Sequence, residues 1–193
     1  NYNGNWSNDL RQGKGKCVYH NGDTYEGEWS DDIINGYGIF TYANGDIYDG
    51  DWISYKKQGK GSMIFFNGDK YQGEWINSSF QGQGTLTSKN GDKYVGQWFN
   101  NEKEGRGTFT DSFGNRYVGD WKNGDKEGKG TYSFVGQSKE ENSGDVDSHT
   151  FLKGNRYVGE WKEGYFHGEG TFTYSNGDTY KGAWIKDKRN GKG

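Results

Sequence analysis

The stretch NGDTYEGEW at residues 21–29 returns, with few changes, as NGDIYDGDW at 44–52 and as NGDKYQGEW at 67–75. The tryptophans of the 193-residue chain follow one another at intervals of 23 residues, with a single interval of 40 before Trp161. A fixed period of this length is typical of a repeat protein. We therefore expect one domain over 1–193, an array of about eight units marked by Trp6, Trp29, Trp52, Trp75, Trp98, Trp121, Trp161 and Trp184.

Each unit has the pattern of a β-hairpin. Tyr25, Gly27 and Trp29 fall on one face of an extended chain because side chains of a strand alternate, and polar residues lie between them. The stretch GYGIFTY at 36–42 alternates in the same way. The Asn-Gly pair at 44–45 favours a type I′ turn, since both residues accept positive φ. We expect this pair to join two strands, and a six-residue loop to follow each tryptophan.

The glycine between the two aromatic residues indicates how a thin sheet is stabilised. A residue without a side chain, such as Gly27, allows a neighbouring ring to lie flat across the backbone. One hairpin is marginal in water, so successive hairpins must stack on one another. The Gly-x-Gly pair before each first strand is expected to be tight or bulged. The sequence thus predicts an all-β fold, an elongated, twisted, single-layer antiparallel sheet of stacked β-hairpins.

Composition narrows the class of protein. Only 28% of residues are hydrophobic, yet 18% are aromatic and 35 are glycine, so rings and bare backbone must supply the buried surface. A net charge of −3 argues against a nucleic-acid binder. Cys17 is the only cysteine, and no apolar run could span a bilayer, so we expect a cytoplasmic protein. The chain opens and closes inside a unit and is expected to be a fragment of a longer array.

The long interval contains a departure from the period. It exceeds 23 by 17 residues, which fall within GQSKEENSGDVDSHTFLK at 136–153. These residues are polar, small and charged, without periodicity. They predict a flexible insertion at about 137–153, at a hairpin tip. A docking or phosphorylation segment is the alternative.

The units YEGEWSDDIINGYG (25–38), YVGQWFNNEKEGRG (94–107) and YVGEWKEGYFHGEG (157–170) resemble the MORN family, named for "membrane occupation and recognition nexus". The resemblance covers essentially the whole chain. It implies a protein-interaction and dimerisation module, with phosphoinositide binding also proposed for the family. Such arrays occur beside enzyme domains and in scaffolds of the cell cortex. The Asn- and Lys-rich composition is similar to the MORN scaffold of apicomplexan parasites, associated with the basal complex and cell division.

The residues themselves predict no active site. Cys17 and His20 lie three apart on a predicted strand and face opposite ways, so only a metal shared between two molecules could use both. Carboxylates that recur once per hairpin, such as Asp23 and Asp46, should lie about 10 Å apart and serve the Asn-Gly turns. The Gly-x-Gly pairs precede strands rather than helices, unlike phosphate-binding loops. We expect a non-enzymatic protein without cofactor.

The aromatic face is the expected partner site, because a single layer should leave it partly open. The groove residues would be Tyr25, Trp29, Tyr48, Trp52, Tyr71, Trp75, Tyr94, Trp98, Tyr117, Trp121, Tyr157 and Trp161. The alternative is that these rings form the core. An uncapped sheet edge also predicts a homodimer through Phe172, Tyr180 and Trp184.

The rival function is a peripheral membrane adaptor that binds anionic lipids. Its contacts would be Lys70, Lys93, Arg116, Arg156, Lys186, Lys188 and Arg189. Carboxylates one position before each tryptophan share this face and should screen the cations. We therefore expect a protein-binding, dimerising scaffold of the cytoplasm, at the cell cortex or the cytoskeleton. A lipid adaptor and the regulatory array of a larger enzyme are the alternatives.

Overall fold

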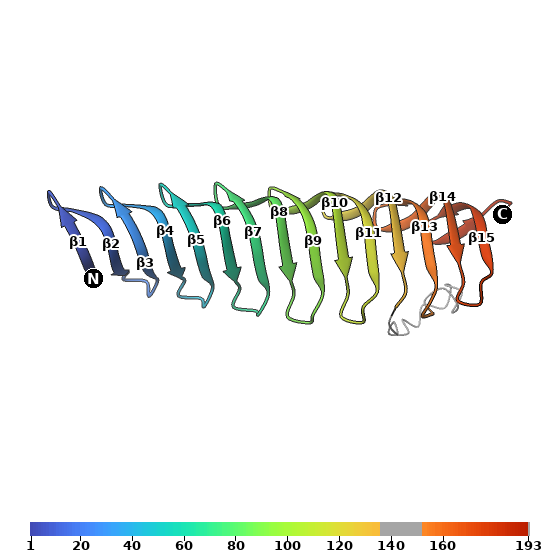
Figure 1. The fold of residues 1–193 in the computed structure, drawn as a ribbon, viewed down its shortest axis with the longest axis horizontal. Coiled ribbons are helices and arrows are strands. Elements are labelled where there is room, and N and C mark those ends of the chain that lie inside the picture. Colours follow the sequence, from blue (N-terminus) through green and yellow to red (C-terminus); the bar gives the residue numbers. More distant parts are fainter. Residues whose placement is uncertain (136–151, 193) are drawn as a thin grey trace. The chain divides into compact units, whose positions relative to one another are not determined.

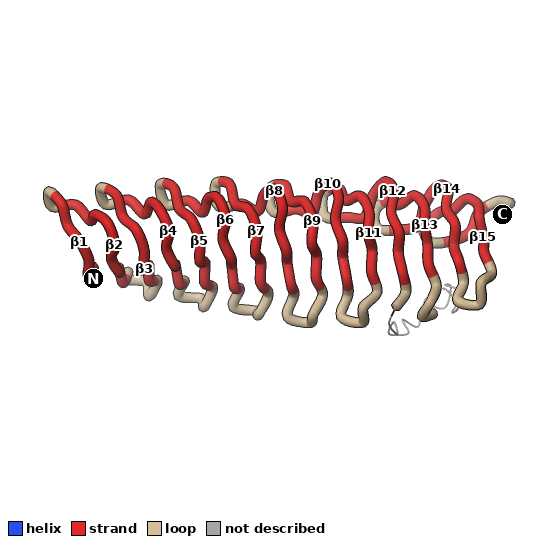
Figure 2. Tube along the Cα trace, in the orientation of Figure 1, coloured by secondary structure: helices blue, strands red, loops and turns tan. Residues whose placement is uncertain are grey.

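The computed structural model of the chain describes residues 1–135 and 152–192 (Figure 1). The described residues form strands and loops and no helix (Figure 2), and so none that could span a membrane. The strands pair antiparallel in one open sheet, in the order in which they occur in the chain. The predicted all-β sheet of consecutive hairpins is confirmed.

Odd-numbered and even-numbered strands differ in length and composition. Most odd-numbered strands have seven residues and contain the Tyr-x-Gly-x-Trp motif of a repeat. Most even-numbered strands have nine residues and contain the Gly-x-Gly pair. The strands are β1 (Tyr2–Ser7), β2 (Leu10–Val18), β3 (Thr24–Ser30), β4 (Ile33–Thr41), β5 (Ile47–Ile53), β6 (Lys56–Ile64), β7 (Lys70–Ile76), β8 (Ser79–Thr87), β9 (Lys93–Phe99), β10 (Glu102–Thr110), β11 (Arg116–Lys122), β12 (Asp125–Ser133), β13 (Arg156–Lys162), β14 (Tyr165–Thr173), β15 (Thr179–Ile185) and β16 (Lys188–Asn190).

The chain divides into two compact units. Unit 1 comprises Asn1–Lys89 and Trp98–Asn101, and unit 2 comprises Asn90–Gln97 and Glu102–Gly193. In both units, short loops join the strands at one end and longer loops join them at the other (Figure 1). The same repeat geometry is found in each unit.

The short loops follow the tryptophans, where the sequence predicted six loop residues. Only Asp31 and Asp32 separate β3 from β4, and their φ angles are +48° and +66°. Two consecutive residues with positive φ are what a type I′ turn requires. The six-residue loop is therefore wrong. The type I′ geometry occurs here, at a pair that is Asn-Gly in only one unit, Asn123-Gly124.

The Asn-Gly pairs lie instead in five-residue loops such as 42–46. The N–H of Gly45 donates to the carbonyl oxygen of Tyr42 at 2.9 Å, and the N–H of Tyr42 donates to that of Asp46 at 2.9 Å. Gly45 has φ +95°, whereas Asn44 is not among the residues with positive φ, so the predicted type I′ turn at Asn-Gly is wrong. The side chain of Asn44 is used for hydrogen bonds: Oδ1 accepts the N–H of Asp46 and Nδ2 donates to Asp46 Oδ2.

The first glycine of each Gly-x-Gly pair forms the expected bulge. In the pairing of β3 with β4, Gly27 lies opposite Gly38 and Trp29 lies opposite Ile34, so a single residue of β3 faces three residues of β4. Gly36 takes φ +104° within that bulge. The bulge shifts the register after the glycine pair and sets which side chain of β4 faces the tryptophan.

The core of each unit is a ladder of tyrosine and tryptophan rings on one face of the sheet, which we call the inner face. Tyr48 packs edge-on against Trp52 of its own repeat, with ring centroids 4.9 Å apart, and against Trp75 of the next repeat at 5.1 Å. In unit 2, Tyr117 contacts Trp121 and Trp161 in the same manner. Each tyrosine thus joins two consecutive repeats.

The insertion predicted at 137–153 falls between β12 and β13. Most of it lies outside the described residues. The residues that flank it keep the hydrogen bonds of a five-residue loop: the N–H of Phe134 donates to the carbonyl of Asn155, and the N–H of Gly154 donates to the carbonyl of Phe134. β12 and β13 pair in the same register as the other hairpins.

Candidate functional site

The aromatic residues predicted to line a partner groove are buried. The twelve tyrosines and tryptophans from Tyr25 to Trp161 named above have relative exposures of 0 to 5%. The expectation that a single-layer sheet leaves them partly open is wrong, because a second layer of side chains covers them. These rings form the core and do not offer a surface to a partner.

The covering side chains come from the position five residues after each tryptophan. We call these residues the cover row; they are Arg11, Ile34, Lys57, Phe80, Lys103, Lys126, Phe166 and Arg189. The bulge brings this position opposite the tryptophan of its own hairpin, as in the pair Trp75 and Phe80. Every member is a cation or an apolar residue. That restriction is visible in the sequence and would have identified the row.

Aromatic members of the cover row stack on the tyrosine beneath them. The ring of Phe80 lies 3.6 Å from that of Tyr71 with 12° between the planes. Phe166 stacks on Tyr157 at 3.9 Å and 15°. The phenylalanine covers one face of the tyrosine ring and the glycine backbone lies against the other, which explains why the tyrosine has almost no exposure.

Lysine members place their ammonium groups among three rings. Lys126 Nζ lies 5.5 Å from the ring centroid of Tyr117, 4.8 Å from that of Tyr132 and 5.0 Å from that of Trp161. Lys103 has the same arrangement with three other rings. A cation over aromatic faces is attracted by their negative quadrupole. The lysine therefore substitutes for the phenylalanine of other repeats.

Burial changes the acid–base chemistry of this layer. It lowers the pKa of Lys126 to about 8, with the neighbouring Lys103 also acting to lower it and Asp187 and Asp111 acting to raise it. Burial likewise lowers the pKa of Lys57 and of Lys103. Perturbed lysines of this kind are frequent at functional sites and also occur in structural clusters.

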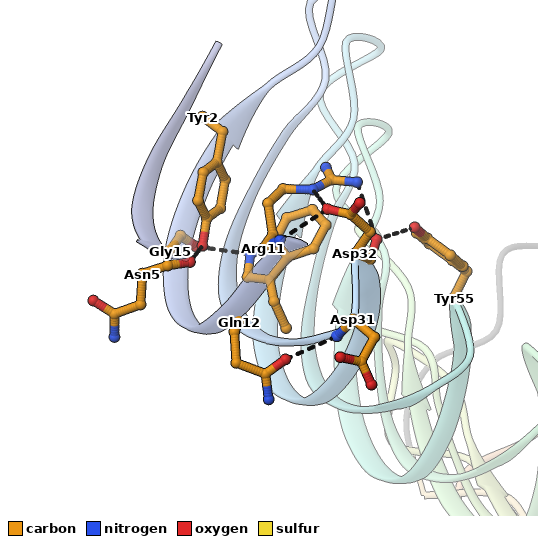
Figure 3. A network of polar contacts seen from close by, with 9 residues as sticks. Tyr2, Asn5, Arg11, Gln12, Gly15, Asp31, Asp32 and Tyr55 are labelled. Carbon is orange, nitrogen blue, oxygen red and sulfur yellow. Dashed lines mark hydrogen bonds and ion pairs between the residues drawn. The ribbon is translucent and has the colours of Figure 1, made fainter. Parts of the chain in front are cut away.

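The short loops connect consecutive repeats through polar contacts (Figure 3). Asp32 Oδ1 accepts hydrogen bonds from the backbone N–H of Arg11 at 2.9 Å and from Arg11 Nε at 2.7 Å. The Arg11 guanidinium lies over the Trp29 ring, 4.1 Å from its centroid. The hydrogen bond from the Arg11 side chain lowers the pKa of Asp32. Arg11 therefore stabilises the contact between the first two repeats.

The recurring aspartates serve the longer loops, and they also connect repeats. Asp46 Oδ1 accepts the N–H of Phe66 in the next loop at 2.8 Å, and Asp23 accepts that of Ala43 in the same way. In two repeats of unit 2, Asn115 and Asn155 fill this position; both are buried and accept the equivalent N–H. Their predicted role beside the turns is confirmed.

The predicted lipid contacts are all exposed, but they do not share one face. Lys70, Lys93, Arg116 and Arg156 lie on the outer face, opposite the aromatic core. Lys186 lies in the loop before β16, Lys188 begins β16, and Arg189 belongs to the cover row of the inner face, over the Tyr180 ring. The neighbours of Arg116 across the sheet are Thr110 and Ser133, which carry no charge. Neither of these two neighbours is a carboxylate, and the screening of the cations stays a prediction. Asp120 lies four residues after Arg116 on the same strand. Its carboxylate accepts a hydrogen bond from Arg106 at 3.0 Å and another from the backbone N–H of Lys129.

Large apolar side chains are also exposed on the outer face. The residue directly after the tryptophan is Ile53, Ile76 and Phe99 in three consecutive repeats of unit 1, with relative exposures of 57, 49 and 60%. We call these three residues the apolar row. Ile185 fills this position in the last repeat and is 49% exposed, whereas the remaining repeats place a serine or lysine there, as at Ser30 and Lys122. None of the three residues of the apolar row is among those that the sequence pattern predicted to form a site.

Unit 2 has a hollow of about 440 Å³ on its outer face. β-branched side chains from β11 to β13 form its floor and charged side chains of both signs surround it. The lining residues are Arg106, Val118, Lys129, Gly130, Thr131, Val158, Gly159, Glu160 and Glu169. Its mixture of charges, with Lys129 opposite Glu160, indicates no single class of ligand.

The remaining predicted residues do not come together into a site. β2 ends at Val18, so His20 is an exposed loop residue and not a strand residue, while Cys17 is buried opposite Tyr25. No group of three or more histidine, cysteine or carboxylate residues that could hold a metal occurs within residues 1–135 and 152–192. At the predicted dimer interface, Phe172 and Trp184 are buried within the chain and Tyr180 is partly buried.

Comparison with solved structures shows a similar fold. The TCP domain of SAS-4 (dCPAP) of Drosophila melanogaster, in complex with a proline-rich motif of Ana2 (dSTIL), matches with a TM-score of 0.50 and 14% identity over 89% of this chain and 84% of that one. The TCP10 domain of Danio rerio CPAP matches over 89% of both chains with 11% identity and a TM-score of 0.22. At these identities the first likeness concerns the fold alone. No curated protein sequence matches the chain.

The family model for the MORN repeat matches almost the entire chain. The matched segments are 2–24, 25–47, 48–70, 71–93, 94–116, 117–139, 157–179 and 180–193. Each full segment begins at the tyrosine whose ring covers the glycine pair, and the segments repeat with the period of the tryptophans. On the basis of this match and of the stacked hairpins, the chain belongs to the MORN repeat family.

Proposed function

We propose that the chain is a non-enzymatic scaffold that binds protein partners through its outer face. The observation that carries this proposal is the apolar row of Ile53, Ile76 and Phe99, which lies uncovered on consecutive repeats. Exposed apolar side chains at the same position of consecutive repeats mark protein interaction sites more often than isolated ones do. MORN membership supports a repeat-based interaction module.

The structural neighbour offers a second line of support. The SAS-4 domain of similar fold was solved in complex with a proline-rich motif. An open sheet of this kind can therefore take up a peptide in that protein. We extend this to a cytoplasmic scaffold, cortical or cytoskeletal, whose repeats present equivalent side chains at regular intervals. Self-association into a dimer belongs to the same proposal and is measured by light scattering.

Affinity capture with a matched variant tests the proposal. The wild-type chain and the triple variant Ile53→Ser, Ile76→Ser, Phe99→Ser are immobilised, and the retained proteins are compared by quantitative mass spectrometry. Ser7 and Ser30 occupy this position in other repeats, so the variant should fold, as circular dichroism would show. We expect a set of proteins that the wild type retains and the variant loses. Identical retention by both would contradict the proposal.

A second candidate is binding to anionic membranes through the exposed cations. It is favoured by the neutral neighbours of Arg116 and Arg156, since no carboxylate lies beside them in the same row. Each cation near an anionic surface contributes about 1 kcal/mol. Co-sedimentation with vesicles that contain a polyphosphorylated phosphoinositide, against neutral vesicles, tests it. Binding that falls steeply with salt and with Arg116→Gln, Arg156→Gln supports the membrane role, and no binding excludes it.

A further inference from the structure

Two neighbouring repeats of unit 2 carry lysines in the cover row. Lys103 lies on β10 and Lys126 on β12, so their backbones are separated by about 10 Å, the width of two strands. The lysine of unit 1, Lys57, has Ile34 and Phe80 as its neighbours in the row. Among residues 1–135 and 152–192, it is only in unit 2 that consecutive repeats each hold a lysine ammonium group among three rings, an arrangement we call a cage.

Neither ammonium group forms an ion pair in the part of the chain that the structure describes. The carboxylates that act on them electrostatically are Asp92, Asp111, Asp125 and Asp187. Three of these already accept hydrogen bonds in the loops: Asp92 from Ser112, Asp111 from Asn115 and Asp187 from Phe166. The two cations thus share a half-buried layer without a direct acceptor.

The tryptophans of the same two cages also lack an acceptor. In four repeats the indole N–H donates to a glycine carbonyl of the preceding repeat, as from Trp75 Nε1 to Gly61 at 3.2 Å. The indole N–H groups of Trp121 and Trp161 are buried and have no acceptor among the described residues. The ring centroid of Trp121 lies 4.9 Å from Lys103 Nζ, and that of Trp161 lies 5.0 Å from Lys126 Nζ. Because both indole N–H groups are buried, only the two ammonium groups of these adjacent cages can reach a ligand.

Uncompensated donors in a half-buried layer favour a ligand that supplies negative charge. A carboxylate accepts charge-assisted hydrogen bonds, and its attraction to an ammonium is stronger where water is partly excluded. The rings around each ammonium, among them Phe109 and Tyr132, offer apolar contact to the rest of such a ligand. We propose that the inner face of unit 2, at the half-buried Lys103 and Lys126 and the rings of Phe109 and Tyr132 beside them, binds an acidic peptide segment of a partner protein.

This site is separate from the apolar row, which belongs to the outer face of unit 1, so either proposal can fail without the other. The probe is a hexaglutamate peptide with blocked ends, compared with hexaglutamine, and added to the whole chain. Binding is followed by tryptophan fluorescence and by the NMR signals of the lysine side chains. We expect hexaglutamate to bind and to shift the signals of Lys103 and Lys126, and hexaglutamine not to bind.

Substitutions locate the site. Lys103→Met with Lys126→Met keeps long, flexible side chains that pack on rings but removes both charges. It should weaken hexaglutamate binding at least about tenfold, as expected when close charge pairs are lost. Lys57→Met is the matched control, because Lys57 is caged alike but single, and its tryptophan neighbour Trp75 has its acceptor. It should change the affinity less than about twofold.

Three results would overturn the inference. One is the absence of hexaglutamate binding at millimolar peptide. Another is equal binding by the wild type and the double variant, when thermal unfolding shows that both are folded. The third is a loss of binding with Arg116→Gln, Arg156→Gln, which would place the peptide on the outer face.

Discussion

Tyr48 lies so close to Gly61 that a Cβ atom on residue 61 would be 2.4 Å from Tyr48 Oη and 2.7 Å from the ring. The hydroxyl group of Tyr48 donates to the carbonyl of Asp51 at 3.0 Å, which fixes the ring across the glycine pair. The same contact recurs where Tyr157 covers Gly170. The period of the sequence follows from this contact, because each tyrosine needs bare backbone on two strands.

Gly61→Ala should therefore destabilise the chain by about 3 kcal/mol through overpacking against the tyrosine. Gly61 is not among the residues with positive φ, so the cost is steric rather than conformational. Gly177→Ala provides the contrast. Gly177 has φ +94° and open space around it, and this variant should lose about 1 kcal/mol through backbone strain alone. Urea unfolding of both variants measures the difference, and equal costs would disprove the close contact.

Asp46→Ala should cost about 1–2 kcal/mol, since the N–H of Phe66 and the amide of Asn44 both lose their acceptor. Asp46→Asn retains an oxygen for Phe66, as Asn155 does for Ser175, and should cost less than half as much. Thermal unfolding compares the two. If the asparagine variant were the less stable, the bond between neighbouring loops would not be what stabilises this position.

Phe80→Lys should be tolerated better than Phe80→Asp. Phe80 occupies the cover-row position that Lys57 fills in the preceding repeat, where the ammonium lies 5.0 Å from the Trp75 ring centroid. A lysine at 80 regains part of the lost stacking through cation–π attraction, so we expect a loss of about 1 kcal/mol. An aspartate would face the negative ring faces and should cost at least about 3 kcal/mol. Equal losses in urea unfolding would argue against the cover row as a cationic position.

The free energy of unfolding should rise with pH above 8 and pass through a maximum near pH 10. Burial lowers the pKa of Lys126 to about 8, below its unfolded value, so between these values the unfolded chain binds more protons and stability rises with pH. Burial raises the pKa of Tyr42 and of Tyr132 to about 12. Above pH 10 the unfolded tyrosines ionise first, the folded chain holds more protons, and stability falls.

The variant Lys126→Met separates these two contributions. The free energy of unfolding of this variant should no longer rise between pH 8 and 10, but it should still fall above pH 10. Urea unfolding midpoints measured from pH 7 to 11 provide the comparison. A rise that persists in the variant would mean that another group causes it.

The sequence predicted the hairpins and the inner face because they depend on strict periodicity. Tyr25, Gly27 and Trp29 lie where alternation puts them, and Gly36 forms the expected bulge. The lengths of the two kinds of loop were predicted the wrong way round, however, since the two-residue loop follows the tryptophan and the longer loop holds Asn-Gly. Asn-Gly is a strong signal for a type I′ turn, yet the aspartate that follows it draws Asn44 into a longer loop through two side-chain hydrogen bonds.

The surfaces were harder to predict than the fold. Whether the ring of Trp75 is open or covered depends on the bulge, which turns residue 80 inward, and alternation alone does not reveal that shift. The cover row was nevertheless encoded, since its eight positions contain only cations and apolar residues. The pairing of Asp120 with Arg106 rather than with Arg116 follows from the strand register, which the sequence leaves undetermined.

The most direct test of the central claim, that the apolar row of the outer face contacts protein partners, is site-specific photocross-linking. A benzophenone amino acid is placed at position 76 of the full chain, or at the control position 72, which is exposed on the same strand β7. We predict covalent partner adducts from position 76 and none from position 72. Adducts of equal yield from both positions, or from position 72 alone, would contradict the account.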